Sequence, residues 1–268
     1  MVVGNGFTDA IALYRNNRDG TFTRVTDNQI ATTIRDTDGI GWGDYDNDGN
    51  LDLFVAVSGS PGILFRNDGH GSFAKMSNSE IALSAAPSHG CGWGDYDNDG
   101  FLDLVIANHN GQNEHLYRNK SDGTFTRILT GPVVTSGATS GFPAWGDYDN
   151  DGKLDLVVGC VFGQANSVTM FFHNEGRGNF FRVTTFPVLG PMEGFGMEWG
   201  DYDNDGDLDL LGGSYAEAWL HAADVDLLVY RNDGNGTFTR LVLASIGAWS
   251  LSTFGDYDND GWLDIFTH

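Results

Sequence analysis

An acidic segment of eleven residues recurs five times along the chain. It is GDYDNDGNLDL from Gly43, and near-copies begin at Gly94, Gly146, Gly200 and Gly255. The first aspartates of successive copies are 51, 52, 54 and 55 residues apart. A period of this length is typical of a solenoid, a propeller or another repeat array, in which each unit is one supersecondary structure.

A second motif recurs in step with the acidic one. Two aromatic residues stand eight positions apart around a centre rich in Asn, Asp and Gly, as in YRNNRDGTF from Tyr14 and YRNKSDGTF from Tyr117. This pattern is typical of a β-hairpin with a tight loop. The acidic segment itself separates a short strand, such as IGWGDY, from an apolar run, such as LDLFVAV. Each unit therefore predicts four antiparallel strands, the content of one propeller blade.

We expect an all-β, five-bladed β-propeller that forms a single domain over residues 1–268. Four blades are expected at about 28–79, 80–130, 131–185 and 186–244, and the fifth from 245–268 paired with 1–27. From acidic segment to next hairpin the spacing is 21, 22, 25 and 29 residues, and it is 26 when counted from Asp256 through the C-terminus to Tyr14. Such closure would remove an open sheet edge. An open fragment of a longer propeller is the alternative.

The spacing of the aspartates indicates a metal site. Within each segment they fall at positions 1, 3, 5 and 9, and glycine at position 6 permits a sharp turn. Because the first three aspartates occupy alternate positions, their carboxylates point to one side. The residue at position 7 offers its backbone carbonyl, and the aspartate at position 9 completes the ligand set with both of its oxygens. Hard oxygen ligands suit Ca²⁺, whereas Zn²⁺ prefers His or Cys. Ordinary turn chemistry needs only one or two such residues. An EF-hand is excluded, because position 12 of the first copy is Val55 rather than Glu.

The sequence therefore predicts five Ca²⁺ sites, each with four aspartates and one backbone carbonyl. The ligand sets are Asp44, Asp46, Asp48, Asn50 and Asp52; Asp95, Asp97, Asp99, Phe101 and Asp103; Asp147, Asp149, Asp151, Lys153 and Asp155; Asp201, Asp203, Asp205, Asp207 and Asp209; and Asp256, Asp258, Asp260, Trp262 and Asp264.

On these motifs the chain resembles the FG-GAP and VCBS-type repeats of integrin-α-like β-propellers. The resemblance rests on WGDYDNDGNLDL and its four counterparts and extends over the whole chain. It implies a Ca²⁺ ion between the first two strands of each blade, with every ligand present in all five copies. Rings of this family usually have seven blades, so five is a departure. The family includes lectins, adhesion domains and some polysaccharide lyases, so the resemblance indicates a scaffold and leaves the function open.

The charge of the chain excludes several partners. The formal net charge is −23, and 21 of the 37 acidic residues lie in the five acidic segments. With a pI near 4.2 and no basic stretch, the chain is not expected to bind nucleic acid or an anionic membrane. No apolar run is long enough to enter a bilayer, and the N-terminal residues are not a signal peptide. Cys91 and Cys160 are expected to be free, buried thiols.

Ligand recognition is expected on the face opposite the acidic segments. The links between second and third strands vary in length, whereas the acidic segments and tight hairpins keep theirs, and a variable face is typical of recognition. The ligand-binding candidates are Trp219, Trp249, His89, Phe195 and Glu198. Two repeated sets are expected to be structural instead. They are the tryptophans Trp42, Trp93, Trp145 and Trp199, packed between blades, and the hairpin residues Arg15, Arg66, Arg118 and Arg231, with His173 in the fourth copy.

We therefore expect a calcium-stabilised binding module that acts outside the cell or in the periplasm. It would bind carbohydrate in the manner of a lectin, or a protein, as a monomer or as part of a larger secreted protein. No residue is assigned as catalytic. One alternative is a polysaccharide lyase or hydrolase, for which unrepeated acids and bases are available in two clusters. They are His109, Glu114 and His115, and Glu217, His221 and Asp224. The other alternative is a scaffold without a small ligand.

Overall fold

The computed structural model describes residues 2–3, 11–33, 37–77, 79–83, 85–137, 140–160, 168–184, 193–214, 226–245 and 252–267. Four antiparallel sheets in this part have four strands each, in sequence order. We call each sheet, with the acidic segment between its first two strands, a blade, and that segment its acidic corner. The strands of blades one to four are β4 (Thr37–Gly43), β5 (Asp52–Val57), β7 (Ile63–Asn67) and β8 (Phe73–Lys75); β10 (Ser88–Gly94), β11 (Asp103–Asn108), β12 (His115–Asn119) and β13 (Phe125–Ile128); β14 (Ser140–Gly146), β15 (Asp155–Cys160), β16 (Met170–Asn174) and β17 (Phe180–Val183); and β18 (Glu193–Gly200), β19 (Asp209–Ser214), β20 (Asp226–Asn232) and β21 (Phe238–Ser245).

Smaller elements complete the described structure. Three strands precede blade one and form a sheet of their own, and two further pairs lie elsewhere. The three are β1 (Val2–Val3), β2 (Ala12–Asn16) and β3 (Phe22–Val25), and the pairs are β6 (Ser60–Pro61) with β9 (Ala85–Ala86) and β22 (Ser252–Gly255) with β23 (Asp264–Thr267). Short helices follow β3, β8 and β13: α1 (Gln29–Thr33), α2 (Glu80–Leu83) and the 3₁₀ turn η1 (Val133–Thr135). Among the described residues no helix has the length and apolar character needed to cross a membrane.

The second strands carry the core. All six residues of β5, β11 and β15 are buried, as their continuous apolar sequence predicts for a strand covered on both faces. The apolar clusters lie between blades rather than inside one sheet. Tyr45 and Phe54 of blade one, for example, share a cluster with Leu104, Tyr117 and Phe125 of blade two. Burial between neighbours therefore holds successive blades together.

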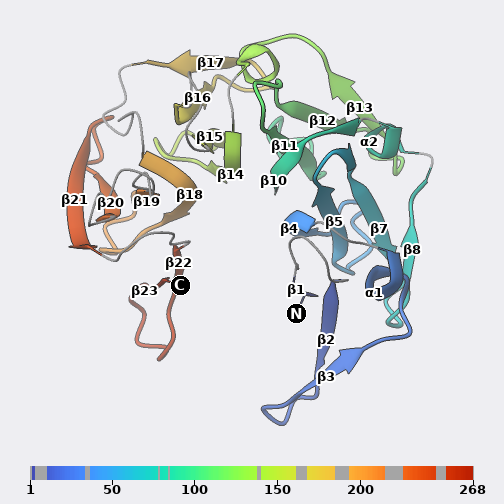
Figure 1. Ribbon diagram of the computed structural model, residues 1–268. Coiled ribbons are helices and arrows are strands. Elements are labelled where there is room, and N and C mark those ends of the chain that lie inside the picture. Colours follow the sequence, from blue (N-terminus) through green and yellow to red (C-terminus); the bar gives the residue numbers. More distant parts are fainter. Residues whose placement is uncertain are drawn as a thin grey trace.

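Glycines in the first strands allow the blades to meet closely. In Figure 1 the first strands line the inside of an arc, and the fourth strands lie on its outside. A Cβ atom on Gly39 of β4 would lie 2.7 Å from the carbonyl oxygen of His89 in β10. A Cβ atom on Gly90 would likewise lie 2.7 Å from the carbonyl oxygen of Gly141 in β14. Any larger residue would push the first strands apart.

Among the described residues, the expected seam between the two ends of the chain is not formed. β2 lies between β1 and β3, and within the described residues β22 and β23 pair only with each other. Figure 1 shows β22 and β23 apart from β2. The reason is that β1 covers the edge of β2 that the seam would use. Val2 pairs with Leu13 as Val105 of β11 pairs with Leu116 of β12, so β1 already fills the second-strand position. The prediction of a ring closed by β23 and β2 is corrected accordingly.

Candidate metal centres at the acidic corners

The backbone of each acidic corner is a tight turn held in an unusual conformation. Asn47, at position 4, has φ of 56°, and Gly49, at position 6, has φ of 88°. Asn and Gly are the residues that adopt this left-handed region at least cost. The same pair of positive φ angles recurs in the other four corners, at Asn98 and Gly100, Asn150 and Gly152, Asn204 and Gly206, and Asn259 and Gly261. One local sequence therefore produces one corner geometry five times.

The first aspartate holds the turn together. The two carboxylate oxygens of Asp44 accept hydrogen bonds from the backbone N–H groups of Asp48 (3.0 Å) and Gly49 (2.9 Å). The position-1 aspartates of the other corners, Asp95, Asp147, Asp201 and Asp256, accept the same two bonds. The N–H of the position-7 residue donates to the position-5 carboxylate, as Asn50 does to Asp48 at 2.9 Å. The proposed role of the position-7 carbonyl as a ligand stays a prediction.

The aspartate at position 9 is buried and joins the corner to the hairpin. Asp52 is 0% exposed, and it accepts hydrogen bonds from the N–H groups of Tyr45 (3.2 Å) and Asn67 (2.8 Å). Burial raises the pKa of Asp52 to about 6. The same cause raises the pKa of Asp103 to about 8 and that of Asp155 to about 7. Each carboxylate oxygen of Asp52 therefore accepts one backbone hydrogen bond. The spacing of the aspartates in the sequence did not reveal this structural role of Asp52.

The aspartate at position 3 supplies the observation that fits a cation. Oδ1 of Asp46 is buried and has no hydrogen-bond partner, and the same is true of Oδ1 in Asp97 and Asp203. Burying an ionised oxygen without a partner is costly. In addition, one oxygen from each of Asp44, Asp46 and Asp48 lies within 4.8 Å of the others, and corners two and three bring their first three aspartates together in the same way. In corner four the clustered set is Asp201, Asp203 and Asp209. The donors are all carboxylate oxygens, the ligands that Ca²⁺ prefers.

Side chains of the third strand bring positive charge to the corners. Arg66 lies 2.5 Å from Asp46 and 3.1 Å from Asp48, and Arg118 lies 2.6 Å from Asp97 in blade two. Arg231 of blade four instead pairs with Asp233 of its own hairpin, at 2.8 Å. The repeated arginines therefore connect hairpin and corner in blades one and two, which extends the structural role expected of them.

Neighbouring corners are linked by hydrogen bonds from the asparagine at position 4. The side-chain amide of Asn47 donates to the carbonyl oxygen of Gly100 in the next corner at 2.8 Å. Asn98, Asn150 and Asn204 make the equivalent bond to Gly152, Gly206 and Gly261. The signal for this link was present in the sequence, since Asn at position 4 is repeated in all five copies.

Aromatic residues beside corners one, two and three close the contacts between blades. Tyr45 stacks on Trp93 of blade two with ring centroids 6.3 Å apart, and Trp93 donates from Nε1 to the carbonyl oxygen of Gly41 at 3.2 Å. Trp145 and Trp199 make the corresponding bonds to the preceding blade. The predicted inter-blade role of these three tryptophans is confirmed. The matching role of the corner tyrosine was missed, although it too is repeated.

The ligand-binding candidates are only partly described. Trp219 and Trp249 lie outside the described residues, as does the side chain of Phe195. His89, at the start of β10, packs against His109 and Phe142, with ring centroids 5.7 and 5.5 Å away. Glu198 of β18 accepts a hydrogen bond from the backbone of Phe254 at 3.0 Å, which is a contact between blade four and β22. His89 and Glu198 thus lie on different blades.

Among the described residues, the acid and the bases available to the enzyme alternative make separate contacts. Glu114 is buried and accepts hydrogen bonds from the N–H of Asn108 (2.8 Å) and from the hydroxyl of Ser140 in blade three. Burial raises its pKa to about 8. His115 packs against Tyr117, and His109 against His89. The second cluster, at Glu217, His221 and Asp224, lies outside the described residues. Neither Cys91 nor Cys160 forms a disulfide in the described part of the chain, as predicted; Cys160 is buried as expected, whereas Cys91 is only half-buried.

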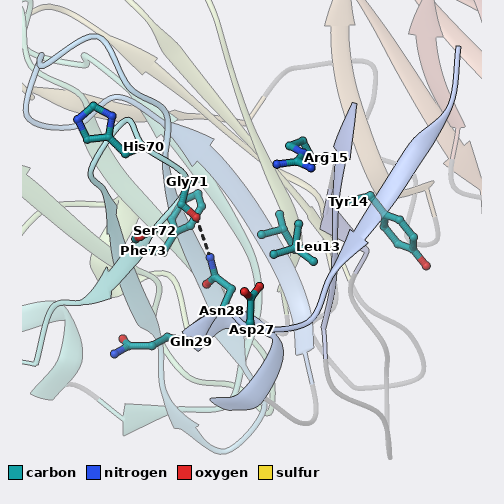
Figure 2. Close-up of a pocket in the computed structure, with 11 residues that line it drawn as sticks. Leu13, Tyr14, Arg15, Asp27, Asn28, Gln29, His70, Gly71, Ser72 and Phe73 are labelled. Atoms are coloured by element: carbon teal, nitrogen blue, oxygen red, sulfur yellow. Dashed lines mark hydrogen bonds between the residues drawn. The ribbon is translucent and has the colours of Figure 1, made fainter. Parts of the chain in front are cut away.

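A cavity of about 610 Å³ lies between β2, β3 and the hairpin of blade one. Figure 2 shows Asn28 donating to the carbonyl oxygen of Gly71 across it, at 3.2 Å. Its hairpin wall includes Gly71 and Phe73. The residues at these hairpin positions in blade three, Gly178 and Phe180, lie against Tyr96 of the preceding corner. The cavity therefore corresponds to the place where a corner tyrosine packs at the other contacts between blades.

Comparisons with known proteins identify the repeat. The model of the FG-GAP-like repeat matches residues 1–55, 44–106, 95–158, 160–212 and 217–267. Cartilage acidic protein 1 of Mus musculus is 26% identical over 168 residues, which cover 60% of this chain and 26% of that protein. The Homo sapiens protein of the same name is 27% identical over 169 residues, covering 61% and 25%. The matched region thus spans about a quarter of the length of these relatives.

A solved structure is similar over almost the whole chain. It is a lectin of Agrocybe aegerita that specifically recognises non-reducing terminal N-acetylglucosamine. It superposes with a TM-score of 0.62 at 19% identity, covering 96% of this chain and 68% of that one. This likeness concerns the fold, a β-propeller-like array of antiparallel sheets.

Proposed function

Because the chain belongs to the FG-GAP-like repeat family, we propose that it is a calcium-stabilised binding module that works outside the cell and recognises carbohydrate. The family and the lectin likeness point to a non-enzymatic binding fold. The matched region covers only 26% of the Mus musculus relative. The module can therefore belong to a larger protein with further domains.

The calcium part of the proposal rests on the buried, unpartnered oxygens of Asp46, Asp97 and Asp203. In each corner the aspartates at positions 1, 3 and 5 would hold the ion, with position 9 and the position-7 carbonyl completing the set. When bound, the ion supplies two positive charges to carboxylates that otherwise repel one another. Calcium at extracellular, millimolar concentration saturates even weak sites of this kind.

The carbohydrate part of the proposal concerns the face opposite the corners. Three rings, His89, His109 and Phe142, meet there where β10 and β14 begin and β11 ends. Sugars commonly pack on aromatic rings, and the ring nitrogens offer hydrogen bonds that orient a polar ligand. Trp219 and Trp249 remain candidates on the variable links of this face.

Glycan-array binding tests this function. The full chain is applied with calcium, and again after chelation, and the expected result is selective glycan binding that weakens at least tenfold without calcium. The variant Phe142→Ala should lose binding. Phe181→Ala, which changes an exposed aromatic on β17, is the matched control and should retain it. Absence of binding to any glycan by the folded, calcium-loaded protein would reject the carbohydrate proposal.

A further inference from the structure

Two triplets of the sequence have an asparagine followed two positions later by a serine or threonine, with no proline between them. They are NKS from Asn119, at the end of β12, and NGT from Asn235, in the hairpin between β20 and β21. This pattern is the acceptor for N-linked oligosaccharide in secreted proteins. An acceptor must also be reached by a bulky donor, and the surroundings of the two asparagines differ in that respect.

Asn119 is a structural residue of the contact between blades. It is 1% exposed, and its Nδ2 donates to the carbonyl oxygens of Tyr45 at 2.7 Å and Leu102 at 3.0 Å. Asn174 and Asn232 make the equivalent bonds in blades three and four. The amide nitrogen that would carry a sugar is therefore already used to join corner one to blade two.

Asn235 lies at the exposed tip of its hairpin, together with Gly236 and Thr237. Its Oδ1 accepts hydrogen bonds from the N–H of Thr237 at 3.1 Å and from the hydroxyl of Thr237 at 2.6 Å. In the described structure its Nδ2 donates none. A Cβ atom on Gly236 would meet no atom within 4 Å, so the tip projects into open space. The two side chains that define the triplet thus lie together on an accessible surface.

Other hairpins show that the turn does not need the amide of Asn235. In the hairpin between β2 and β3, Asp19 accepts the same two bonds from Thr21, at 3.0 and 2.6 Å. In the hairpin between β12 and β13, Asp122 accepts them from Thr124, at 2.9 and 2.5 Å. A carboxylate has no N–H to donate, so one side-chain oxygen is sufficient for the turn. The Nδ2 of Asn235 is therefore available for modification without loss to the fold.

The hairpin of Asn235 lies beside acidic corner four. A Cβ atom on Gly234 would lie 2.5 Å from Oδ2 of Asp207 in that corner. His89 and Phe142, by contrast, lie near the starts of β10 and β14, at the opposite end of the first strands. An oligosaccharide on Asn235 would cover the corner end of blade four and leave the proposed recognition face clear.

We propose that Asn235 is the acceptor of an N-linked oligosaccharide, supplied by a lipid-linked diphosphate donor, and that Asn119 is not. Transfer forms a bond between Nδ2 and the first carbon of the sugar and breaks the bond between that carbon and the diphosphate. The lipid diphosphate leaves, and the amide loses one proton. The inference rests on the extracellular location in the proposed function, and on neither the calcium sites nor carbohydrate recognition.

Secretion of the full chain from cultured eukaryotic cells, behind a cleavable leader, tests the site. Enzymatic removal of N-glycans in heavy-oxygen water converts each glycosylated asparagine to a labelled aspartate, which peptide mass spectrometry locates. We expect the label at Asn235 and none at Asn119. Asn235→Asp, which reproduces the turn residue of two other hairpins, should fold as the wild type does and lose the oligosaccharide. Ser121→Ala, which destroys the other triplet at an exposed position, is the matched control and should keep it.

A second reaction makes the test independent of secretion. The folded chain, purified without glycans, is incubated with a single-subunit oligosaccharyltransferase and a lipid-linked donor, and the product should gain one oligosaccharide at Asn235. A wild type that stays unmodified in both reactions, or an oligosaccharide found at Asn119, would overturn the inference. Glycan-array binding by Asn235→Asp is measured separately and should equal that of the wild type. Absence of binding by both proteins would reject the carbohydrate part of the proposed function and leave the acceptor site in place.

Discussion

At the scale of single residues, Glu114 is the clearest case of a group whose role depends on where it is buried. It was a candidate acid for the enzyme alternative. Its carboxyl instead accepts hydrogen bonds from the N–H of Asn108 at the end of β11 and from the hydroxyl of Ser140 in blade three. A carboxyl in this position is held by hydrogen bonds rather than presented to a substrate. The residue thus serves the contact between blades two and three.

The raised pKa of Glu114 predicts how stability changes with pH. The pKa of Glu114 is about 8 in the folded protein, against an ordinary 4.5. Its contribution to the free energy of unfolding is therefore fully present below about pH 4.5 and is lost as the pH rises through 8. The slope from one group is at most about 1.4 kcal/mol per pH unit. Glu114→Gln should remove this slope. Urea unfolding of both proteins from pH 5 to 8 measures it, and parallel curves for the two would contradict the assignment.

Single residues also show what sequence reasoning can recover. The aspartate spacing predicted that positions 1, 3 and 5 converge, because alternation and a glycine turn are local properties of the chain. The backbone donors to Asp52 could not be predicted, since Asn67 lies fifteen residues away in sequence on another strand. A local sequence pattern cannot predict contacts that depend on how distant strands are placed beside one another.

At the scale of the elements, identical corners differ in their neighbours. Tyr45 is 1% exposed because Trp93 and Phe125 cover it, whereas Tyr257, at the same position of corner five, is 82% exposed. The repeated sequence predicted four of its five four-stranded units correctly, and the turn at each acidic corner. It could not predict that β1, rather than β23, covers β2, because both segments have the composition of a second strand.

This difference predicts unequal effects of the same substitution. Tyr45→Ala removes a buried aromatic side chain and should destabilise the protein by about 3–5 kcal/mol. Tyr257→Ala should change stability by no more than about 0.5 kcal/mol, since it alters an exposed position. Urea midpoints of the two variants, measured with calcium at the same concentration, provide the comparison. A large loss in Tyr257→Ala would show that corner five is covered in solution.

At the scale of the whole molecule, the concentration of charge in the corners governs the response to calcium. The formal net charge is −23, and five divalent ions would offset ten of those charges. The arginines beside corners one and two, already counted in that net charge, offset part of the local carboxylate charge without any ion. The remaining repulsion should make the metal-free protein markedly less stable than the loaded one.

Removal of calcium should therefore lower the melting temperature strongly. At a hundredfold excess over the dissociation constant, each site that binds only the folded protein stabilises it by about 2.7 kcal/mol. The contributions of five sites will not add fully. Differential scanning calorimetry with calcium and with excess chelator measures the shift, and magnesium at equal concentration serves as the control. A melt unchanged by the chelator would reject calcium as the resident ion.

The hydrogen bond from Asn47 to Gly100, with its three counterparts, gives the array a direction. Every unit offers an amide on one side and a carbonyl on the other, so any two neighbours fit in a single order. A duplicated unit would meet a carbonyl acceptor on one neighbour and an asparagine donor on the other. Removal of one unit would bring together two units that can form the same bond. A chain built this way can therefore gain or lose whole repeats, in evolution or in the laboratory.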